Sequence, residues 1–509
     1  MEIKKKNKIG SGTHGLVYRV ETPKGLAAVK VMRPDEDDDH HDVYTHGVLR
    51  EVSSLKFLAH PNVVTILDVC DSGIVLELMD GSLWDRIHND RHIISVDTAK
   101  SWMQQLLRGI SHFHTNKMMH RDLKPGNLLL SNKDTVLKIA DLGATRMQPE
   151  PARGMSTEVT TIYYKAPELL NLGSVAEYTA AVDIWAVGCI MHEMITGDIC
   201  FGRAKNDTDL KELHGDFKYK PLKRLDEDGN DLLQRLLCLN PTKRLTAQQA
   251  LQHPWFGGGG VEVAIFAAAA ETNAALQLPP DITERMRTVL IEWFHDIAAE
   301  QEISRDTIHL AVAYVDSVLS SQEANIKMCK LQLLGVACLD LATKMHEMYG
   351  LGELYCVTLC DSAYTRGEFK TMQKFVVAES LKWNLIRKTG LGIAFDLFKM
   401  VPDVQMCNDI KMCTDCPSTR MHKWDRVAEA MDYLLLDGWM LTPLDRAAVA
   451  ICYAFGPWVL KHLCLGNNTN NLDTKSVLKW RRMIPKLPHL DKNQCLCNSV
   501  LQMQMNRSD

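Results

Sequence analysis

The chain has 509 residues, of which 46% are hydrophobic and 24% are charged. This composition is typical of ordinary globular domains and excludes a disordered or fibrous protein. At one domain per 100–200 residues, the length predicts about two to four compact units. The net charge of -5 disfavours nucleic-acid or membrane-surface binding as the main activity.

Cysteine usage and the absence of apolar segments predict an intracellular protein. No apolar stretch follows the lysines at 4–6, and no segment approaches the roughly 18 apolar residues that span a bilayer. The fifteen cysteines are odd in number, which favours free thiols in a reducing compartment over a disulfide framework. Basic clusters at 4–8 and 479–482 leave nucleus and cytoplasm open.

A change in composition near the middle divides the chain. Four glycines at 257–260, an alanine run and a proline pair predict a flexible linker over 257–280. Before it, short strand-like runs give way to helical periodicity from about residue 97, which predicts a sheet-rich lobe followed by a helical lobe. After it, apolar residues recur at spacings of three and four, so the second half is predicted to be all-helical.

A glycine-rich segment between two predicted strands carries the first chemical signal. Its glycines allow backbone N–H groups to approach a polyphosphate without obstruction by side chains. Lys30 ends the next strand, where it could neutralise phosphates, although a lone strand lysine usually lies at the surface. These two features are weak evidence when taken alone.

An ordered set of motifs downstream makes phosphoryl transfer the favoured chemistry. Glu51 lies on a predicted helix, and His-Arg-Asp at 120–122, Asp-Leu-Gly at 141–143 and Ala-Pro-Glu at 166–168 follow in order. Each motif residue has a physical role: Asp122 accepts the proton of a substrate hydroxyl, Asn127 and Asp141 hold magnesium, and Glu51 orients Lys30.

These motifs resemble the eukaryotic protein kinase family over residues 1–256. The resemblance implies an α+β bilobal kinase fold, ATP and Mg²⁺ as cofactors, and protein substrates. Lys124 is similar to the lysine of the serine/threonine class that contacts the transferring phosphate. Leu142 replaces the usual phenylalanine and leaves the metal-binding aspartate intact. The ATP-binding residues that the resemblance implies are Ile9, Gly10, Gly12, Gly15, Val17, Lys30, Glu77 and Met79.

Residues 45–52 and 60–64 are similar to the cyclin-binding helix of cyclin-dependent kinases and the segment after it. Ser156 falls where that family carries its activating phosphate, and Thr157 is the alternative acceptor. A dianionic phosphate there requires guanidinium partners, and the resemblance supplies them as Arg50, Arg121 and Arg146. An upstream activating kinase is then an expected partner. An unmodified polar loop remains the alternative interpretation.

Other parts of the same resemblance bear on inhibition and specificity. Thr13 is a regulatory candidate in the glycine-rich loop, and His14 stands where an inhibitory tyrosine is usual, which excludes tyrosine-directed inhibition there. Val159, Thr160 and Lys165 are similar to the residues that favour proline after the acceptor, so Ser/Thr-Pro substrates are expected.

The motifs at 286–293, 330–337 and 341–344 resemble a cyclin box, which implies an all-α cyclin fold over 281–384. Lys344 and Glu379 match the positions that meet the kinase. A substrate-docking groove for an Arg-x-Leu motif is implied as well, although burial in a core explains such helical spacing equally. The residues of this groove would be Met286, Val289, Trp293, Leu331 and Gln332, with Asp296 receiving the arginine.

Helical periodicity predicts a second cyclin-like fold over 385–465, followed by a polar tail over 466–509. Three cysteines and a histidine between residues 407 and 422 invite a zinc hypothesis, but the set lacks the paired C-x2-C spacing of common zinc sites. The residues in question are Cys407, Cys413, Cys416 and His422.

The combined prediction is a cyclin-dependent type of serine/threonine kinase that its own fused cyclin activates in cis. The linker of about 24 residues has a root-mean-square reach of about 27 Å, which allows such a contact. Two alternatives stay open: a kinase-like scaffold, and a cyclin module that activates another kinase in trans. The sequence leaves open whether the substrates belong to the cell cycle, to transcription or to a host cell.

Overall fold

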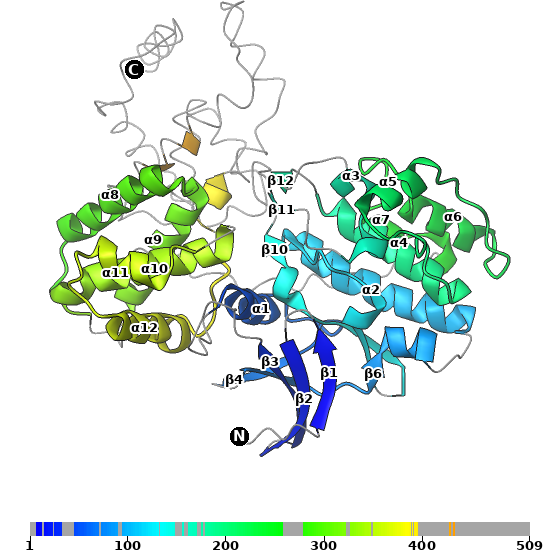
Figure 1. The fold of residues 1–509 in the computed structure, drawn as a ribbon, viewed down its shortest axis with the longest axis horizontal. Helices are drawn as coiled ribbons and strands as arrows, with labels where there is room; N and C mark the ends of the chain where they lie inside the picture. Colours follow the sequence, from blue (N-terminus) through cyan, green and yellow to red (C-terminus); the bar gives the residue numbers. More distant parts are fainter. Residues whose placement is uncertain are drawn as a thin grey trace, which may run out of the picture. The chain divides into compact units, whose positions relative to one another are not determined.

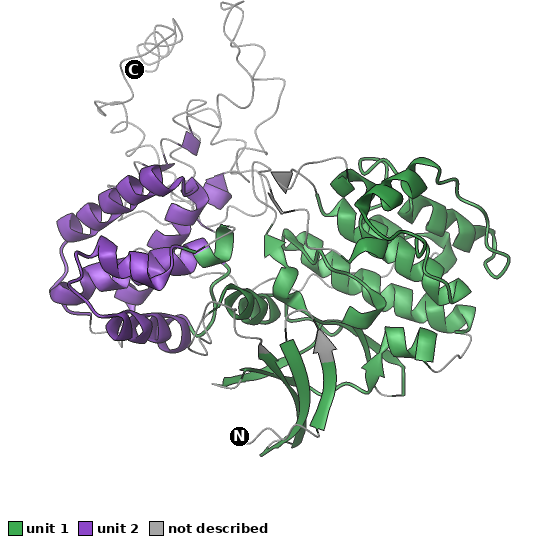
Figure 2. Ribbon diagram, viewed as in Figure 1, with its two compact units in different colours: residues 1–270, 344–350, 382–386 green, residues 271–343, 351–381, 387–509 purple. Residues whose placement is uncertain are grey.

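The structure is a computed structural model that divides into two compact units (Figure 2). Unit 1 comprises residues 1–270, 344–350 and 382–386, and unit 2 comprises 271–343, 351–381 and 387–509. The residues that the structure describes are 7–12, 15–23, 25–32, 45–70, 73–89, 94–131, 133–147, 155–156, 161–170, 175–176, 179–257, 278–321, 326–347, 350–387, 389, 391–394, 427–428 and 431–432. Most of the predicted linker, second helical fold and polar tail lies outside them.

Unit 1 begins with a five-stranded antiparallel sheet in the order β1-β2-β3-β5-β4 (Figure 1). Alternating apolar residues such as Val20, Val29 and Val75 are buried on one face, as period-two patterning requires. Gly73, at φ 139°, allows the start of β5 to lie close to β3, because a Cβ there would lie 2.1 Å from the Lys30 carbonyl oxygen. The strands are β1 (Lys8–Gly12), β2 (Gly15–Thr22), β3 (Gly25–Met32), β4 (Ile66–Cys70) and β5 (Gly73–Glu77).

Helix α1 (His46–Phe57) packs against this lobe. Thr45 caps it by accepting a hydrogen bond from the backbone N–H of Val48, and the helix buries a stripe that includes Leu49, Val52 and Leu55. Glu51 lies on the same buried face. A single amphipathic helix therefore carries a carboxylate into the interior of unit 1.

The second lobe of unit 1 is mainly helical. Its central helices are α2, which Ser95 caps by accepting from Thr98 N, and α4, which is buried over most of its length. The α-helices are α2 (Val96–Thr115), α3 (Pro167–Leu170), α4 (Ala181–Thr196), α5 (Asp207–Gly215), α6 (Glu227–Leu236) and α7 (Ala247–Leu251). The short helical turns are η2 (Asp85–Asn89), η3 (Pro125–Asn127), η4 (Leu142–Ala144), η5 (Ile162–Tyr164) and η6 (Pro254–Phe256).

Short strands on this lobe place the loops that carry the motifs. A three-stranded sheet of order β6-β8-β9 precedes the Asp-Leu-Gly segment, and two-stranded pairs join β7 with β10 and β11 with β12. These strands are β6 (Gly81–Ser82), β7 (Met118–Met119), β8 (Leu128–Ser131), β9 (Val136–Ile139), β10 (Arg146–Met147), β11 (Met155–Ser156) and β12 (Val175–Ala176).

Unit 2 is helical throughout its described part. Arg287 is buried on α8 and forms a bidentate ion pair with Asp316 of α9, at 2.7 and 2.8 Å. Asp340 of α10 is buried and accepts from Gln373 Nε2 at 2.6 Å. The elements are α8 (Glu284–Gln301), α9 (Arg305–Ser320), η7 (Met328–Lys330), α10 (Leu331–His346), α11 (Glu353–Leu359), α12 (Arg366–Lys374) and η8 (Phe375–Ser380), with the end of α10 assigned to unit 1.

A short segment far along the chain completes the packing of unit 2. Val427 and Met431 are buried, and Asp432 accepts from His309 at 3.1 Å and from Arg305 at 2.9 Å. The part of the chain that the structure describes contains no helix long and apolar enough to cross a membrane.

Candidate active site

Lys30 joins three separate elements of unit 1. Its Nζ lies 2.7 Å from both carboxylate oxygens of Glu51 on α1 and 2.7 Å from Asp141 Oδ1, just before η4. Burial alone would lower the pKa of Lys30, but the charges and hydrogen bonds of the two carboxylates outweigh it and raise the pKa. The lysine therefore remains a cation in a buried position.

Asp122 is the centre of a second cluster. Its Oδ2 accepts from Lys124 Nζ at 2.7 Å and from Asn127 Nδ2 at 3.2 Å. Its Oδ1 accepts from both the backbone N–H and the hydroxyl of Thr161, each at 3.1 Å. Lys124 Nζ also donates to the Thr161 hydroxyl at 2.9 Å. Sequence reasoning missed Thr161, since no motif marks a residue 39 positions beyond the aspartate.

A buried carboxylate holds the loop that carries Asp122. Asp183 on α4 accepts from the backbone N–H groups of His120 and Arg121, at 3.0 and 2.9 Å, and from His114 at 2.9 Å. Burial would raise the pKa of Asp183, but the hydrogen bond and charge of His114, with the other donors, lower it instead. This brace supports a loop in which Arg121 has a left-handed backbone at φ 71°.

The glycine-rich hairpin and the strand end at Glu77 face the same region from the first lobe. Gly10 lies opposite Val17 across β1 and β2, and a Cβ on Gly10 would lie 3.5 Å from Val17 Cβ. The carboxylate of Glu77 accepts hydrogen bonds from Lys138, at 2.6 and 2.9 Å, so this carboxylate is engaged within the protein. Thr13 lies outside the described residues.

The donor set fits a divalent cation held partly by phosphates. Asp141 supplies carboxylate oxygens, and the Asn127 amide nitrogen donates to the Asp122 carbonyl at 2.8 Å, which leaves the amide oxygen for a ligand. Both are hard oxygen donors of the kind that Mg²⁺ prefers, and Mg²⁺ usually takes its other ligands from phosphates and water. The described residues contain no group of three His, Cys, Asp or Glu side chains that could hold a metal ion.

Two known families match successive parts of the chain. Residues 3–256 match the family model "Protein kinase domain", and residues 267–386 match "Cyclin, N-terminal domain". The chain contains a protein kinase domain followed by an N-terminal cyclin domain. The predicted bilobal kinase fold and the helical cyclin fold are thereby confirmed. A protein kinase domain implies the use of ATP, a divalent metal and protein substrates in general, and a cyclin domain implies an interaction between a cyclin and a kinase.

Three arginines of unit 1 gather beside the activation segment of the kinase domain. Burial, together with the positive charges of Arg146 and Arg121, lowers the pKa of Arg50 to about 8. Arg50 Nη2 donates to the carbonyl of Glu347, and Arg146 Nη1 donates to that of Met345, at 2.8 and 2.9 Å. The Nε of Arg50 is buried without a hydrogen-bond partner. The positive charges of the three arginines repel one another, and an anion bound among them would reduce this repulsion.

The predicted phosphorylation sites fall at the edge of the described residues. Ser156 lies on β11, opposite Val175 of β12, while Thr157 lies outside the described part. Val159 and Thr160 also lie outside it, as do the four residues of the zinc hypothesis. Lys165, the third residue of the predicted proline pocket, is buried and pairs with Asp207 at 2.6 Å.

The two predicted interface residues lie in different units. Lys344 is buried near the end of α10, in the segment that belongs to unit 1. Glu379 is exposed on η8 of unit 2. Their roles stay predictions.

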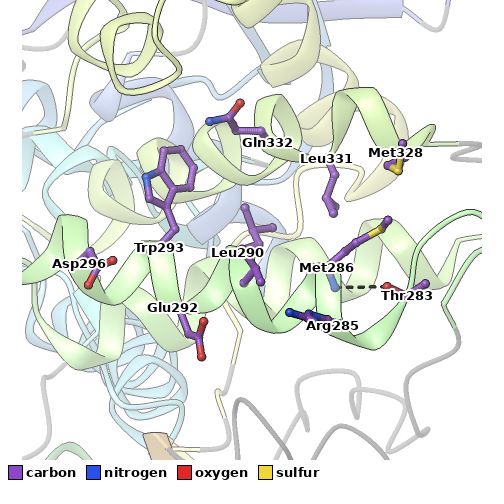
Figure 3. A pocket seen from close by; sticks show the side chains of 11 residues that line it. Thr283, Arg285, Met286, Leu290, Glu292, Trp293, Asp296, Met328, Leu331 and Gln332 are labelled. Atoms are coloured by element: carbon purple, nitrogen blue, oxygen red, sulfur yellow. Dashed lines mark hydrogen bonds between the residues drawn. The ribbon is translucent and has the colours of Figure 1, made fainter.

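The residues predicted to form a docking groove line one pocket of the cyclin domain. A pocket of about 760 Å³ lies between α8 and the start of α10, and Figure 3 shows its lining side chains. All six predicted residues line it. Val289 is 55% exposed, so this apolar side chain is not explained by burial in a core. The lining residues are Thr283, Arg285, Met286, Val289, Leu290, Glu292, Trp293, Asp296, Met328, Leu331 and Gln332.

Proposed function

We propose that the protein is a serine/threonine kinase of the cyclin-dependent type that uses Mg-ATP. The observation that carries this proposal is the double contact of Lys30, which touches Glu51 and Asp141 in one structure. A kinase requires the ion pair between the lysine and the glutamate, and it requires the aspartate in place to hold the metal against the phosphates. An intact set of this kind also argues against the alternative of a catalytically dead scaffold.

In the proposed mechanism, Asp122 accepts the proton of the substrate hydroxyl. Thr161 holds one of its oxygens and Lys124 the other, so the carboxylate is fixed in orientation before substrate binds. Lys124 can then turn toward the charge that develops on the transferring group. When bound, Mg²⁺ would neutralise phosphate charge, held by Asn127 and Asp141.

Phosphate transfer by the full chain tests the proposal. We expect transfer from ATP to Ser-Pro peptides, with less transfer to matched Ser-Ala and Tyr peptides. Asp122→Asn should remove the activity and leave the thermal unfolding temperature nearly unchanged, because the amide keeps the shape of the side chain. Asp228→Asn, on the exposed first turn of α6, is the matched control and should retain full activity. Inactivity of wild type in the presence of an upstream activating kinase would contradict the proposal.

The cyclin-dependent type is supported by the proximity of Arg50, Arg121 and Arg146 to one another. A phosphate on Ser156 or Thr157 would offer three acceptor oxygens to guanidinium groups that otherwise repel one another. Activation in cis is supported by unit 1, which includes residues 344–350 of the cyclin match together with the kinase domain. In this unit, α1 carries both Arg50 and Glu51.

The pocket between α8 and α10 is proposed as the docking site for Arg-x-Leu motifs of substrates. Trp293 and Val289 supply an apolar surface, and Asp296 supplies a carboxylate for the arginine. Trp293→Ala should raise the KM of a substrate that carries the motif about 30-fold and leave a motif-free peptide unaffected, since aromatic anchors contribute about 2 kcal/mol or more. An equal effect on both substrates would contradict docking.

A further inference from the structure

An ion pair crosses the hinge between the two lobes of the kinase domain. Glu77 is the last residue of β5, where it lies opposite Ala27 of β3, so it is fixed in the five-stranded sheet. Lys138 lies on β9, opposite Leu129 of β8, so it is fixed in the second lobe. Between them in the chain, Leu78 to Asp80 form the connection from one lobe to the other.

The contact is stronger than an ordinary surface ion pair. Lys138 Nζ donates to both carboxylate oxygens of Glu77, at 2.6 and 2.9 Å, and the two side chains are only 15% and 26% exposed. The backbone N–H of Thr65 donates to Glu77 Oε1 at 2.6 Å, and Glu77 N donates back to the Thr65 carbonyl at 3.0 Å. Fully exposed ion pairs contribute little to stability, because water screens the charges and the side chains lose freedom. Here the two side chains are partly shielded from water, and the Thr65 N–H provides a third hydrogen bond to the carboxylate.

The strand that carries Lys138 is itself held firmly. Leu137 N donates to Gln105 of α2 at 2.8 Å, and Ile139 exchanges backbone hydrogen bonds with residues 62 and 64, at 2.9 Å each. Lys138 is therefore a fixed anchor, and loss of its charge should leave β9 in place. Substitution of Lys138 should therefore change the conformational freedom of the hinge without unfolding the domain.

The ion pair connects both ends of the nucleotide site. Asp141, which contacts Lys30, follows Lys138 by three residues, and Met79, two residues after Glu77, lies in the connection between the lobes. We propose that Lys138 is a positioning residue that holds the hinge in the nucleotide-binding geometry through the carboxylate of Glu77. A hinge held in advance binds its ligand with a smaller entropic cost. This inference rests on the proposed use of ATP by the same site.

The test compares nucleotide binding by the full-length wild type and Lys138→Met. The dissociation constant for Mg-ATP should rise about fivefold, and the KM for ATP should rise with it, while kcat changes less than twofold. Glu77→Gln should have the same effect, and the double variant should be no worse than either single change, because both remove one interaction. Lys138→Arg should restore most of the affinity. Lys223→Met, at an exposed position of the same domain, is the matched control.

A measurement without nucleotide separates this inference from the proposed function. Amide hydrogen exchange over residues 78–82 should be faster in Lys138→Met than in wild type, whether or not the protein transfers phosphate. Unchanged exchange and unchanged nucleotide affinity would overturn the inference. A loss of kcat with unchanged affinity would also overturn it, since Lys138 would then act through Asp141.

Discussion

Lys30 is the residue that most directly connects the fold with the chemistry. It is 6% exposed and yet charged, which only the carboxylates of Glu51 and Asp141 make tolerable. If either Glu51 or Asp141 lost its charge, the other carboxylate would still bind Lys30. The Lys30 ammonium should then move from its position between α1 and η4.

The variant Glu51→Gln measures how much the position of the Lys30 ammonium contributes to kcat/KM. A lost hydrogen bond between charged groups costs about 1.5–3 kcal/mol, so we expect kcat/KM to fall roughly 10- to 100-fold. The variant should remain folded by circular dichroism, since glutamine has nearly the same shape. Its matched control is Glu212→Gln on the exposed side of α5. An unchanged kcat/KM would show that α1 does not position the lysine.

Arg50 gives a second prediction at a single residue. Its buried Nε lacks an acceptor, and Arg146 and Arg121 oppose its charge. Phosphorylation of the activation segment should therefore raise the thermal unfolding temperature, by about 2–4 °C for each kcal/mol gained in a domain of this size. In Arg50→Gln the same phosphorylation should raise it less.

The acceptor is identified by comparing Ser156→Ala with Thr157→Ala. Only the variant that lacks the true acceptor should fail to gain stability after treatment with an activating kinase. If phosphate is incorporated and stability does not change, the arginines do not form its binding site.

At the scale of elements, the aromatic cluster between α4 and α5 contains an unusual histidine. His214 lies edge-on to Trp185 and Phe201, with ring centroids 5.0 and 4.6 Å away. Both of its ring nitrogens are buried without hydrogen-bond partners. Burial lowers the pKa of His214 to about 4, and the charge of Arg244 contributes to the shift.

This histidine should make the kinase domain less stable in acid. The unfolded chain takes up a proton below its ordinary pKa of about 6.5, whereas the folded protein does so only near pH 4, so stability falls as pH falls through this window. His214→Phe should remove this part of the pH dependence. Chemical denaturation at pH 7.5 and pH 5 measures it, and an identical loss of stability in the variant and wild type would exclude His214 as the cause.

Motif spacing made the elements of the active site predictable, whereas contacts outside the motifs could not be foreseen. The ordered motifs predict that Glu51 pairs with Lys30 and that Asp141 holds the metal, whereas the direct contact of Lys30 with Asp141 was not predicted. Lys138 and Glu77 are 61 residues apart on two ordinary strands, and nothing local indicates that they pair. Asp432 reaches His309 across 123 residues, a contact that depends on how unit 2 closes.

At the scale of the whole molecule, the fusion itself is the feature to explain. Two domains on one chain meet at an effective concentration of order mM when the tether is short and flexible. A weak contact between kinase and cyclin would then be formed in nearly every molecule, and activity would not depend on a separately made cyclin. Fusion would replace regulation by cyclin supply with regulation by phosphorylation.

Cutting the tether in the intact protein tests this idea without separate fragments. A protease recognition site inserted after Gly260 should leave the specific activity of the uncut chain constant on dilution, because its contact is intramolecular. After cleavage, activity per mole should fall as the protein is diluted, since the contact has become bimolecular and obeys mass action. The same insertion with a scrambled recognition site controls for the added length. If the uncut chain loses activity on dilution as steeply as the cut one, the cyclin acts in trans, on a second copy of the chain.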